Sequence, residues 1–482
     1  MNLDHQHDLL IRGGTVIDGT RAVRRQADVG VRKGRISAIG QLTHHQATRT
    51  LDATDRIVAP GFIDAHTHDD QALRMRPDMD FKVSQGVTTV ITGNCGVSAA
   101  PLPSRGSLPM PLDLIEVPEG QRHQRFSDYL DDLRAQPAAV NVAALVGHTS
   151  LRACAMASLD RAATPDEIAR MQHLLEEALH AGAIGMSSGT FYPPARHAPM
   201  RELIEVGRPL TAARGLYTTH MRDEGDDILT SLHETFDIGR ALDIPVVISH
   251  HKIRGPHNAG RSRVTLPLIR QHMRHQCVGL DCYPYDASST MIHADPAMLT
   301  GRVLIASSDP HPECAGQYLH DIAANWNVPL VDAARRLQPG SAIYFLMDEH
   351  DVQRILAFDD TMVGSDGIPL GDHPHPRLWG TFPRVLGRYS RDLRLFPLET
   401  AIWKMTGLTA RTFGLADRGE LRAGMAADLV IFDADTVADR ATYDTPQQTA
   451  RGIDWVVVNG EVTWQHGVHC ATRAGQVLRR SA

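Results

Sequence analysis

The sequence predicts an α/β protein: a (β/α)8 TIM barrel with a small β-sandwich domain built from both chain ends and a lid inserted after strand 7. Three observations lead to this prediction. Eight short apolar runs follow one another through the middle of the chain, helical patterns fill most of the gaps, and glycine-punctuated β-type segments occupy both ends. The 482 residues are too many for one ordinary domain, and a large barrel with an appendage accounts for them.

Short β-type segments separated by glycine turns mark both ends of the chain. They are residues 9–11, 15–19, 27–31 and 35–39 at one end, and 427–432 and 455–460 at the other. Because the two ends share a pattern that the middle lacks, we expect them to share one small all-β domain. The expected boundaries are 1–60 plus 414–482 for this domain and 61–413 for the barrel.

Each of the eight apolar runs is typical of a buried parallel strand. The runs are 58–68, 87–95, 140–148, 183–188, 216–221, 245–252, 278–285 and 362–366. Helices are expected over 165–180 (after a Thr164 cap), 226–242, 264–275 and 399–413. The span 286–348 is far longer than the usual loop between a strand and a helix, so we expect it to form the lid over the mouth of the barrel.

Composition narrows the class of partner. Lys and Arg total 49 against 56 Asp and Glu, a net charge of −7, and no basic block stands out, which argues against nucleic acid and acidic membrane surfaces and for a small-molecule ligand. No apolar run approaches the ~18 residues of a spanning helix, and no signal-peptide pattern is seen, so we expect a cytoplasmic protein. The six cysteines show no CxxC pair, which argues against a disulfide scaffold. The oligomeric state stays open.

Potential metal ligands follow the predicted strands at the ends where a barrel builds its active site. His66 and His68 are two residues apart, so in a strand both imidazoles face the same side. The other candidates at strand ends are Cys95, His220, His250 and Asp366. Nitrogen, sulfur and oxygen donors of this kind suit Zn²⁺.

Of the adjacent pair His250 and His251, only one can face the barrel interior, because successive side chains of a strand alternate. We favour His250, since this choice also places Lys252 on the same face. His251 is then expected to be structural.

A set of motifs extends this picture over essentially the whole chain. They are residues 13–19 and 57–68, then 87–90, 93–96, 217–224, 249–252, 283–285, 364–367 and 375–382. The first two resemble the amidohydrolase superfamily, and the others closely resemble, within it, the D-aminoacylases (N-acyl-D-amino-acid deacylases). The resemblance implies a zinc-dependent enzyme that hydrolyses N-acyl-D-amino acids to a carboxylate and a free D-amino acid.

The resemblance also implies roles for the strand-end residues. It implies one tightly held zinc on Cys95, His220 and His250, a second and weaker metal site on His66 and His68, and Asp366 as the catalytic acid/base. Zinc would make water acidic and polarise the acyl oxygen, while Asp366 would take the proton of water and hand it to the departing amine.

The scarcity of lysine supports this branch of the superfamily. Many binuclear relatives bridge their metals with a carboxylated lysine at the end of the fourth strand, which is 185–189 here. None of the four lysines, at positions 33, 82, 252 and 404, lies near it. A thiolate at Cys95 is the natural substitute.

Substrate contacts are expected at two groups of residues. For the α-carboxylate, Arg377 can form a bidentate pair, Lys252 a point-charge contact and Tyr283 a hydrogen bond. Ser289 and Tyr192 are also expected to contact the substrate. The resemblance implies a side-chain pocket at Phe191, Leu299, Tyr344 and Met347, whose apolar character favours D-Met, D-Leu or D-Phe.

Three alternatives stay open on the sequence. Arg302 or His293 could receive a second carboxylate, which would indicate an N-acyl-D-glutamate or N-acyl-D-aspartate deacylase. A cyclic-amide hydrolase of the hydantoinase or dihydroorotase type is a second alternative, which a carboxylated lysine would favour. A catalytically inactive scaffold is the third, and it predicts lost ligands, whereas all the expected ligands are present.

Overall fold

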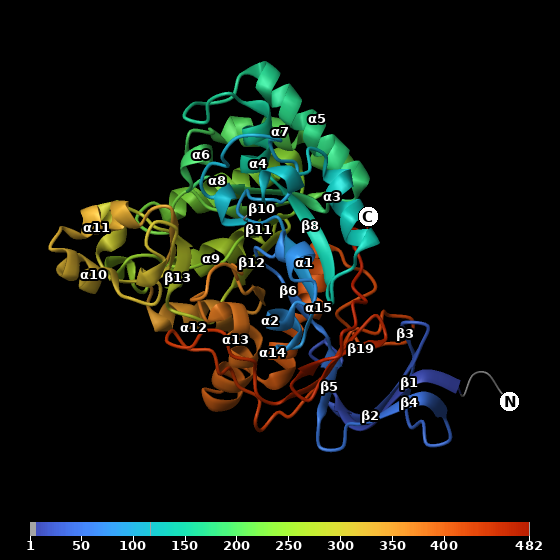
Figure 1. Ribbon diagram of the computed structural model, residues 1–482. Helices are drawn as coiled ribbons and strands as arrows, with labels where there is room; N and C mark the ends of the chain where they lie inside the picture. The colour runs from blue at the N-terminus through green and yellow to red at the C-terminus, as the bar shows by residue number, and fades with distance from the viewer. Residues whose placement is uncertain (1–5, 116, 482) are drawn as a thin grey trace.

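Eight parallel strands form a nearly closed barrel at the centre of the computed structural model, which describes residues 6–115 and 117–481 (Figure 1). The strands are β6 (Phe62–Asp64), β7 (Val87–Thr92), β8 (Asn141–Gly147), β9 (Gly185–Gly189), β10 (Leu216–His220), β11 (Val246–Ile248), β12 (Val278–Cys282) and β16 (Thr361–Val363). Their order in the sheet follows the chain, and the Ala65 amide just beyond β6 donates to the Val363 carbonyl of β16 at 3.2 Å. The predicted barrel is confirmed.

One expected strand is divided in the structure. The run 58–68 contributes to β5 (Ile57–Pro60), which belongs to another sheet, and to β6 of the barrel, with Gly61 between the two. A Cβ at Gly61 would lie 2.2 Å from the Thr88 side chain, so a glycine lets the chain pass close to β7. Apolar character alone does not show where a chain leaves one sheet and joins the next.

Helices surround the barrel (Figure 1). Three expected helices form as α5 (Pro165–Ala181), α8 (Ile228–Leu242) and α9 (Ser262–His272), and Thr164 caps α5 by accepting a hydrogen bond from the Glu167 amide. The helix expected over 399–413 is two helices, α14 (Leu398–Met405) and α15 (Gly407–Phe413), which meet at Thr406. The others are α1 (Ala72–Met75), α2 (Asp80–Val83), α3 (Phe126–Ala135), α4 (His148–Ala155), α6 (Pro193–Arg196), α7 (Met200–Ala213), α12 (Glu349–Ala357) and α13 (Arg377–Arg384).

Within 6–115 and 117–481, no helix has both the length and the apolar character that crossing a membrane requires. The cytoplasmic location expected from the sequence stays a prediction.

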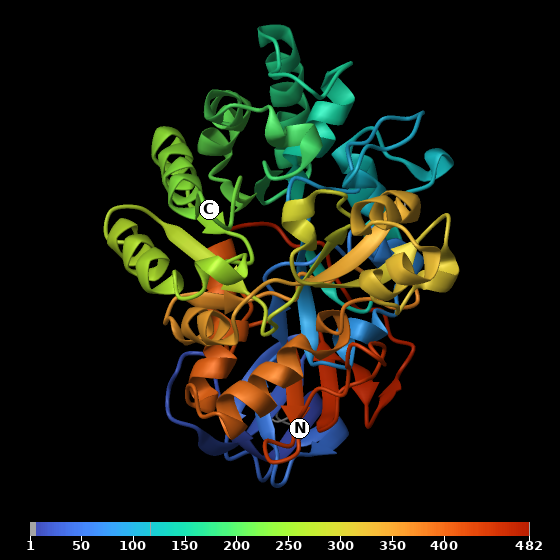
Figure 2. The ribbon, with the colours of Figure 1, turned by 90° about the vertical axis from the view of Figure 1, so that its left-hand side faces the viewer.

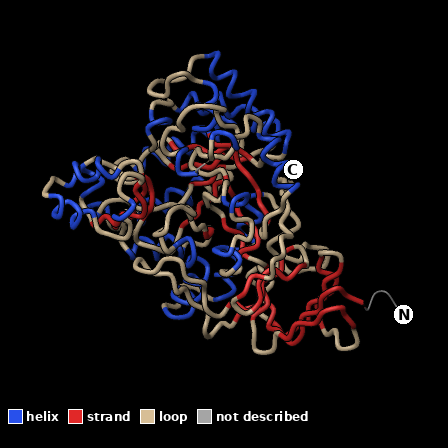
Figure 3. The backbone as a smooth tube through the Cα atoms, viewed as in Figure 1, coloured by secondary structure: helices blue, strands red, loops and turns tan. Residues whose placement is uncertain are grey.

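Both ends of the chain build one mixed sheet of nine strands, seen in Figure 3 as the red strands beside the N-terminus. The strands are β1 (Gln6–Val16), β2 (Arg25–Arg32), β3 (Arg35–Gly40), β4 (Gln46–Asp52), β5, β17 (Leu429–Phe432), β18 (Ile453–Val458), β19 (Glu461–Gln465) and β20 (Val468–His469). The two ends join where β5 pairs antiparallel with β17. Small apolar side chains such as Val29, Val58 and Ile431 form the core of this sheet. The exact domain boundaries stay a prediction.

The long span between the seventh and eighth barrel strands has a fold of its own. It holds the antiparallel strands β13 (Ser288–Met291), β14 (Arg302–Ser308) and β15 (Gly340–Phe345), and the helices α10 (Leu319–Trp326) and α11 (Leu330–Leu337). These elements share an apolar core that includes Ile305, Leu319 and Leu337. In Figure 2 this insertion lies in front of the barrel.

Candidate active site

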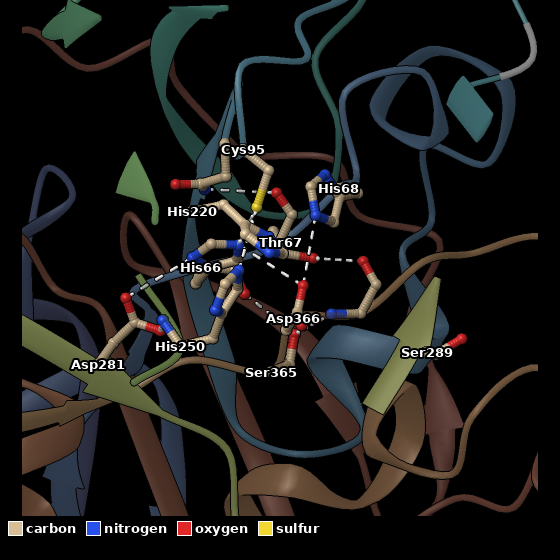
Figure 4. Close-up of polar contacts among 12 residues, drawn as sticks. His66, Thr67, His68, Cys95, His220, His250, Asp281, Ser289, Ser365 and Asp366 are labelled. Carbon is tan, nitrogen blue, oxygen red and sulfur yellow. Dashed lines mark hydrogen bonds and ion pairs between the residues drawn. The ribbon is translucent and has the colours of Figure 1, made fainter. Parts of the chain in front are cut away.

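Six of the expected metal-binding or catalytic side chains gather at the carboxyl ends of the barrel strands (Figure 4). They are His66, His68, Cys95, His220, His250 and Asp366. His220 is the last residue of β10, and each of the others lies two to four positions beyond the end of its strand. All are buried except His68, which is partly exposed. Loops after barrel strands are where enzymes of this fold place their chemistry.

Backbone strain coincides with this cluster. Cys95, His250 and Asp366 have φ angles of 55°, 37° and 48°, in the left-handed region that residues other than glycine seldom adopt. Each such residue costs about 1–3 kcal/mol, and such strain concentrates at functional sites. These three side chains also belong to one group of potential ligands.

The thiol of Cys95 lies at the centre of that group. Its Sγ is 3.3 Å from His66 Nε2 and 3.3 Å from His250 Nε2. Asp366 completes the set, with its Oδ1 3.5 Å from His66 Nε2. One donor atom from each of the four residues lies within 4.8 Å of every other, which is close enough for a shared metal ion.

His220 forms a second group with His250 and Glu224. The His220 Nε2 lies 3.6 Å from Glu224 Oε2, and the His250 Nδ1 lies 3.0 Å from Glu224 Oε1. His250 therefore belongs to both groups. Glu224 was not among the expected ligands, although the spacing of a carboxylate four residues after His220 could have indicated it.

The chemistry of these donors fits a divalent metal. Among the described residues, neither ring nitrogen of the buried His220 has a hydrogen-bond partner. Burial would raise the pKa of the Cys95 thiol, but His66 and His250 outweigh burial and hold that pKa well below its usual range. A thiolate surrounded by imidazoles and a carboxylate is a typical donor set for Zn²⁺.

Asp366 is ionised in this environment. Burial would raise the pKa of its carboxyl, but the charge of Arg377, followed by the neighbouring histidines, holds the pKa well below its usual range. Its Oδ2 is 2.9 Å from Arg377 Nη2, and its Oδ1 is 3.3 Å from His68 Nε2. The carboxylate is thus ready to accept a proton beside the cluster of donors.

The guanidinium of Arg377 has hydrogen-bond donors for which the described residues supply no acceptor. Its side chain is fully buried, and its Nη2 also donates to the Ser289 carbonyl at 3.2 Å. In the described parts of the chain, its Nε and Nη1 have no hydrogen-bond partner. The guanidinium lies 4.6 Å above the centre of the Tyr283 ring. Unpaired buried donors are costly, so the N–H groups of these two nitrogens are suited to an anionic ligand.

Lys252 lies in a different pairing from the one expected. Its Nζ is 2.7 Å from Glu224 Oε1 and 2.7 Å from His250 Nδ1. The ammonium also lies 5.7 Å from the centre of the Tyr283 ring. Lys252 therefore neutralises the carboxylate of Glu224 and faces the same tyrosine as Arg377.

Tyr192 and Ser289 lie beside the candidate site, whereas His251 points away from it. The ring of Tyr192 packs against that of His220 with centroids 4.9 Å apart, and Ser289 lies beside Arg377 through its carbonyl. His251 is turned toward α9, where its Nε2 is 2.9 Å from Thr265 Oγ1.

The four residues expected to form the side-chain pocket do not share one cavity. Phe191 lines a cavity of about 580 Å³ and stacks on His220, with ring centroids 5.2 Å apart. Met347 lies instead in a cavity of about 10 Å³ beside Lys252 and Tyr283. Leu299 and Tyr344 are buried in the core of the insertion.

The two residues expected to receive a second carboxylate also separate. His293 lines the 580 Å³ cavity. Arg302 is exposed, and its Cζ lies 4.4 Å from the centre of the Phe345 ring in the insertion. It does not line that cavity.

Lys82 is a buried residue that the sequence did not single out. Its Nζ lies 2.6 Å from Asp64 Oδ2 and 3.2 Å from Asp69 Oδ2. It also donates to the Ser365 hydroxyl at 2.9 Å. Lys82 therefore joins the segment that carries His66 and His68 to the segment that carries Asp366.

Comparison with known proteins defines the class of this molecule. A profile of the Amidohydrolase family matches residues 49–244 and 318–464, well over half of the chain. The chain belongs to the amidohydrolase family, and it is a metal-dependent enzyme of that family.

Relatives that match the whole chain narrow the class further. The chain is 58% identical to the D-aminoacylase of Alcaligenes xylosoxydans xylosoxydans, covering 98% of both. A solved D-aminoacylase with a binuclear metal centre matches at a TM-score of 0.97, 57% identity, and 98% of this chain and 100% of the other. The N-acyl-D-glutamate deacylase of Bordetella bronchiseptica, solved with zinc and a phosphonate inhibitor, matches at a TM-score of 0.95, 48% identity and the same coverage. Within the amidohydrolases, the chain falls with the D-aminoacylases.

Proposed function

We propose that this chain hydrolyses N-acyl-D-amino acids to a carboxylate and a free D-amino acid. The observation that carries the proposal is the position of Arg377, whose buried guanidinium touches Asp366 and has two nitrogens, Nε and Nη1, without a partner among the described residues. A substrate with an α-carboxylate next to its scissile amide would meet both residues at once. The proposal further rests on membership with the D-aminoacylases.

Zinc is the metal that this donor set supports. Cys95, His220 and His250 would hold one tightly bound ion, and His66 with His68 would form a second, weaker site. Glu224 lies close enough to His220 and His250 to assist at the first site. When bound, zinc supplies Lewis acidity, which polarises the amide carbonyl and makes water more acidic.

Asp366 would transfer a proton from the attacking water to the amide nitrogen of the substrate. Because its pKa lies well below the usual range, the carboxylate is ionised at neutral pH and can accept a proton from the attacking water. It would then donate that proton to the amide nitrogen, since an amine leaves only when it is protonated. His68 Nε2 lies 3.3 Å from one oxygen of this carboxylate, and Arg377 Nη2 lies 2.9 Å from the other, so the two residues orient it.

The α-carboxylate of the substrate would bind to Arg377, Lys252 and Tyr283. Among the described residues, Arg377 Nε and Nη1 have no partner, and the Tyr283 hydroxyl has only the weak acceptor Met347 Sδ at 3.9 Å. Lys252 adds positive charge that Glu224 partly offsets. With the carboxylate and the acyl carbonyl both fixed, only one enantiomer can direct its side chain into the remaining space, and family membership indicates that it is D.

We propose a preference for neutral side chains such as those of D-Met, D-Leu and D-Phe. In the 580 Å³ cavity, the arginines Arg196 and Arg254 are balanced by three aspartates, Asp223, Asp226 and Asp295. Arg254 is already paired with Asp223 at 3.2 Å. The second candidate, a deacylase of N-acyl-D-glutamate or N-acyl-D-aspartate, is favoured by one observation, that His293 lines this cavity.

The test is a kinetic screen of N-acetyl-D- and N-acetyl-L-amino acids with the zinc-loaded protein. We expect turnover of the D series, with D-Met, D-Leu or D-Phe ahead of D-Glu and D-Asp. A preference for the acidic side chains would establish the second candidate. Turnover of hydantoin or dihydroorotate without turnover of any N-acetyl-D-amino acid would overturn the proposal.

A further inference from the structure

Lys82 is a buried cation that the function proposed above does not use. It lies on α2, and its fully buried Nζ donates to Asp64 Oδ2 at 2.6 Å, Thr67 Oγ1 at 3.0 Å and Ser365 Oγ at 2.9 Å. Asp69 Oδ2 lies 3.2 Å away. We call these five residues the Lys82 network. Three hydrogen bonds use all the donors of an ammonium group, so this group ties its three acceptors together.

Asp64 extends the network to two backbone amides. Its Oδ2 accepts from Lys82, and its Oδ1 accepts from the amides of His66 at 3.2 Å and Ser365 at 2.8 Å. Burial would lower the pKa of Lys82, but the charges of Asp64 and Asp69 outweigh burial and raise that pKa, so the lysine is charged at neutral pH. One buried ion pair therefore joins the loop after β6 to the loop after β16.

Asp366 lies in a strained turn beside this network (Figure 4). Its φ angle is 48°, and its amide donates to the His66 carbonyl at 2.7 Å. The Ser365 hydroxyl accepts from Lys82 and, at 3.1 Å, from the Gly367 amide, so it is bonded across the residue that carries the carboxylate. A residue other than glycine keeps a left-handed conformation only where its surroundings hold it. Lys82 and Ser365 supply such support through the backbone on either side of Asp366.

We infer that Lys82 and Ser365 are positioning residues for the hydrolysis, because they hold the turn that directs the Asp366 carboxylate toward the attacking water and the departing nitrogen. This inference rests on the proposed function. A group that transfers a proton has to lie within about 2.6–3.2 Å of its partner atom, and a misplacement of ~1 Å can cost about 10²-fold in rate. A small shift of the turn would therefore slow proton transfer while the metal donors stay in place.

Lys404 is a second buried lysine, and it contacts the same barrel strand at its other end. Its Nζ donates to the carbonyls of Phe358, Asp359 and Thr361, the last two at 3.3 Å, and Thr361 begins β16. Asp366 instead follows the last residue of β16. Loss of Lys404 would weaken the strand without removing a hydrogen bond of the Asp366 turn. Lys404→Met is therefore the control for general damage to this strand.

Ser365→Ala is the variant that tests the inference. It removes one hydroxyl and leaves Lys82 paired with Asp64, whereas Lys82→Met leaves two buried aspartates without a cation and is strongly destabilising. The matched control is Ser308→Ala in the insertion. The Ser308 hydroxyl is likewise buried, and it donates to the Leu337 carbonyl at 2.8 Å.

The first measurement separates kcat from KM for one N-acetyl-D-amino acid. Ser365→Ala should lower kcat about 10-fold or more, because the carboxylate is no longer held in place. Its KM and its tightly bound zinc should stay close to those of the parent, since only an interaction of the transition state is lost. Lys404→Met should lower the denaturant midpoint but keep the parent kcat, and Ser308→Ala should keep both kcat and KM.

The second measurement repeats Ser365→Ala in the Asp366→Asn variant. If Ser365 acts through the Asp366 carboxylate, the substitution should lower the residual kcat no further, because residues that act as a unit have non-additive effects. A serine that only stabilises the fold would lower kcat by the same factor with and without Asp366.

Several outcomes would overturn the inference while the parent remains an active deacylase. Ser365→Ala could keep the parent kcat, lose its zinc together with its activity, or lose activity by the same factor in the Asp366→Asn background. An equal loss of kcat in Lys404→Met would also overturn it, because damage to β16 would then be sufficient. A parent that hydrolyses no N-acyl-D-amino acid would instead remove the proposed function, and this inference with it.

Discussion

The guanidinium of Arg377 and the carboxylate of Asp366 form a buried ion pair, with Nη2 and Oδ2 2.9 Å apart. Arg377 is expected to bind the α-carboxylate of the substrate, and Asp366 is expected to transfer the proton during hydrolysis. The ion pair therefore links substrate binding to proton transfer. Removing the arginine would leave a buried carboxylate without its strongest positive neighbour. This link changes what a substitution of Arg377 should do.

For Arg377→Ala, we expect kcat/KM to fall for an N-acetyl-D-amino acid and, to a lesser extent, for its carboxamide. The carboxamide is affected because the pKa of Asp366 rises when Arg377 is lost. The acid should lose about 10-fold more than the amide, since a charge-assisted hydrogen bond contributes about 1.5–3 kcal/mol. Equal losses for the two substrates would show that Arg377 acts only through Asp366.

Asp366→Asn should keep its metal and lose turnover. The amide has nearly the shape of the carboxylate but does not accept and return a proton, and general acid–base catalysis typically contributes ~10²–10⁴-fold. Elemental analysis and kcat measure the two effects separately. A variant that keeps more than about a tenth of the parent kcat would indicate that another group moves the proton.

Cys95→Ala should lose tightly bound zinc and activity together, because the thiol lies between His66 and His250 at 3.3 Å from each. His220→Ala and His250→Ala should behave in the same way. His251→Ala is the control: its side chain contacts Thr265, so the variant should keep its zinc. A full equivalent of tightly bound zinc in Cys95→Ala would contradict the assignment of this ligand.

Lys82→Met should destabilise the fold. The substitution leaves Asp64 and Asp69 buried without their cation, and breaking a buried ion pair in this way costs about 3–5 kcal/mol. Lys33 lies exposed at a turn, so Lys33→Met should stay within about 0.5 kcal/mol of the parent. Denaturant midpoints compare the two variants. Similar midpoints would show that the Lys82 network contributes little.

Glu202 predicts a pH dependence of stability. Burial raises the pKa of its carboxyl, but His148, the Ala163 amide and Arg152 outweigh burial and lower it to about 2. A lowered pKa stabilises the fold above the ordinary value of 4.5, and this contribution, about 3 kcal/mol, is lost as pH falls from 4.5 toward 2. Glu202→Gln should therefore lower the melting temperature clearly at pH 7. The deficit should narrow below about pH 4.5, and a constant deficit would contradict the prediction.

Much of the site could be predicted because its residues carry local signals. His66 and His68 are spaced two apart at a strand end, and Cys95, His220, His250 and Asp366 follow other apolar runs. In a barrel, all strand ends meet on one rim, so the position in the sequence predicts proximity in space. The structure gathers these six side chains at one rim, but it groups Cys95 with His66, His250 and Asp366, and His220 with Glu224 and His250, so the set Cys95, His220 and His250 expected for the tight zinc site stays a prediction.

The partners of the site could not be predicted in the same way. The contact of Lys252 with the substrate stays a prediction, and the sequence did not show that Glu224 lies 2.7 Å away and takes up part of the lysine's charge. Leu299 and Tyr344 were expected to line a pocket with Phe191; they lie in the core of the insertion, against which Phe191 packs, and they do not line the 580 Å³ cavity. The residue that a side chain contacts depends on the geometry of the loops. The hydrophobic periodicity of the sequence contains no information on that geometry.

By itself, the sequence determined the barrel, the joining of the two chain ends and the positions of the candidate ligands at the strand ends. The hydrophobic period and the turn residues act over a few positions, so short stretches of the sequence are enough to predict these features. Tertiary structure alone decided that Lys82 reaches Ser365, 283 residues away, and that a space of about 20 Å³ with both polar and apolar lining residues remains beside His68. Both depend on how distant segments pack after the barrel has formed, because burial makes every unpaired charge costly and leaves only the space that neighbouring side chains do not fill.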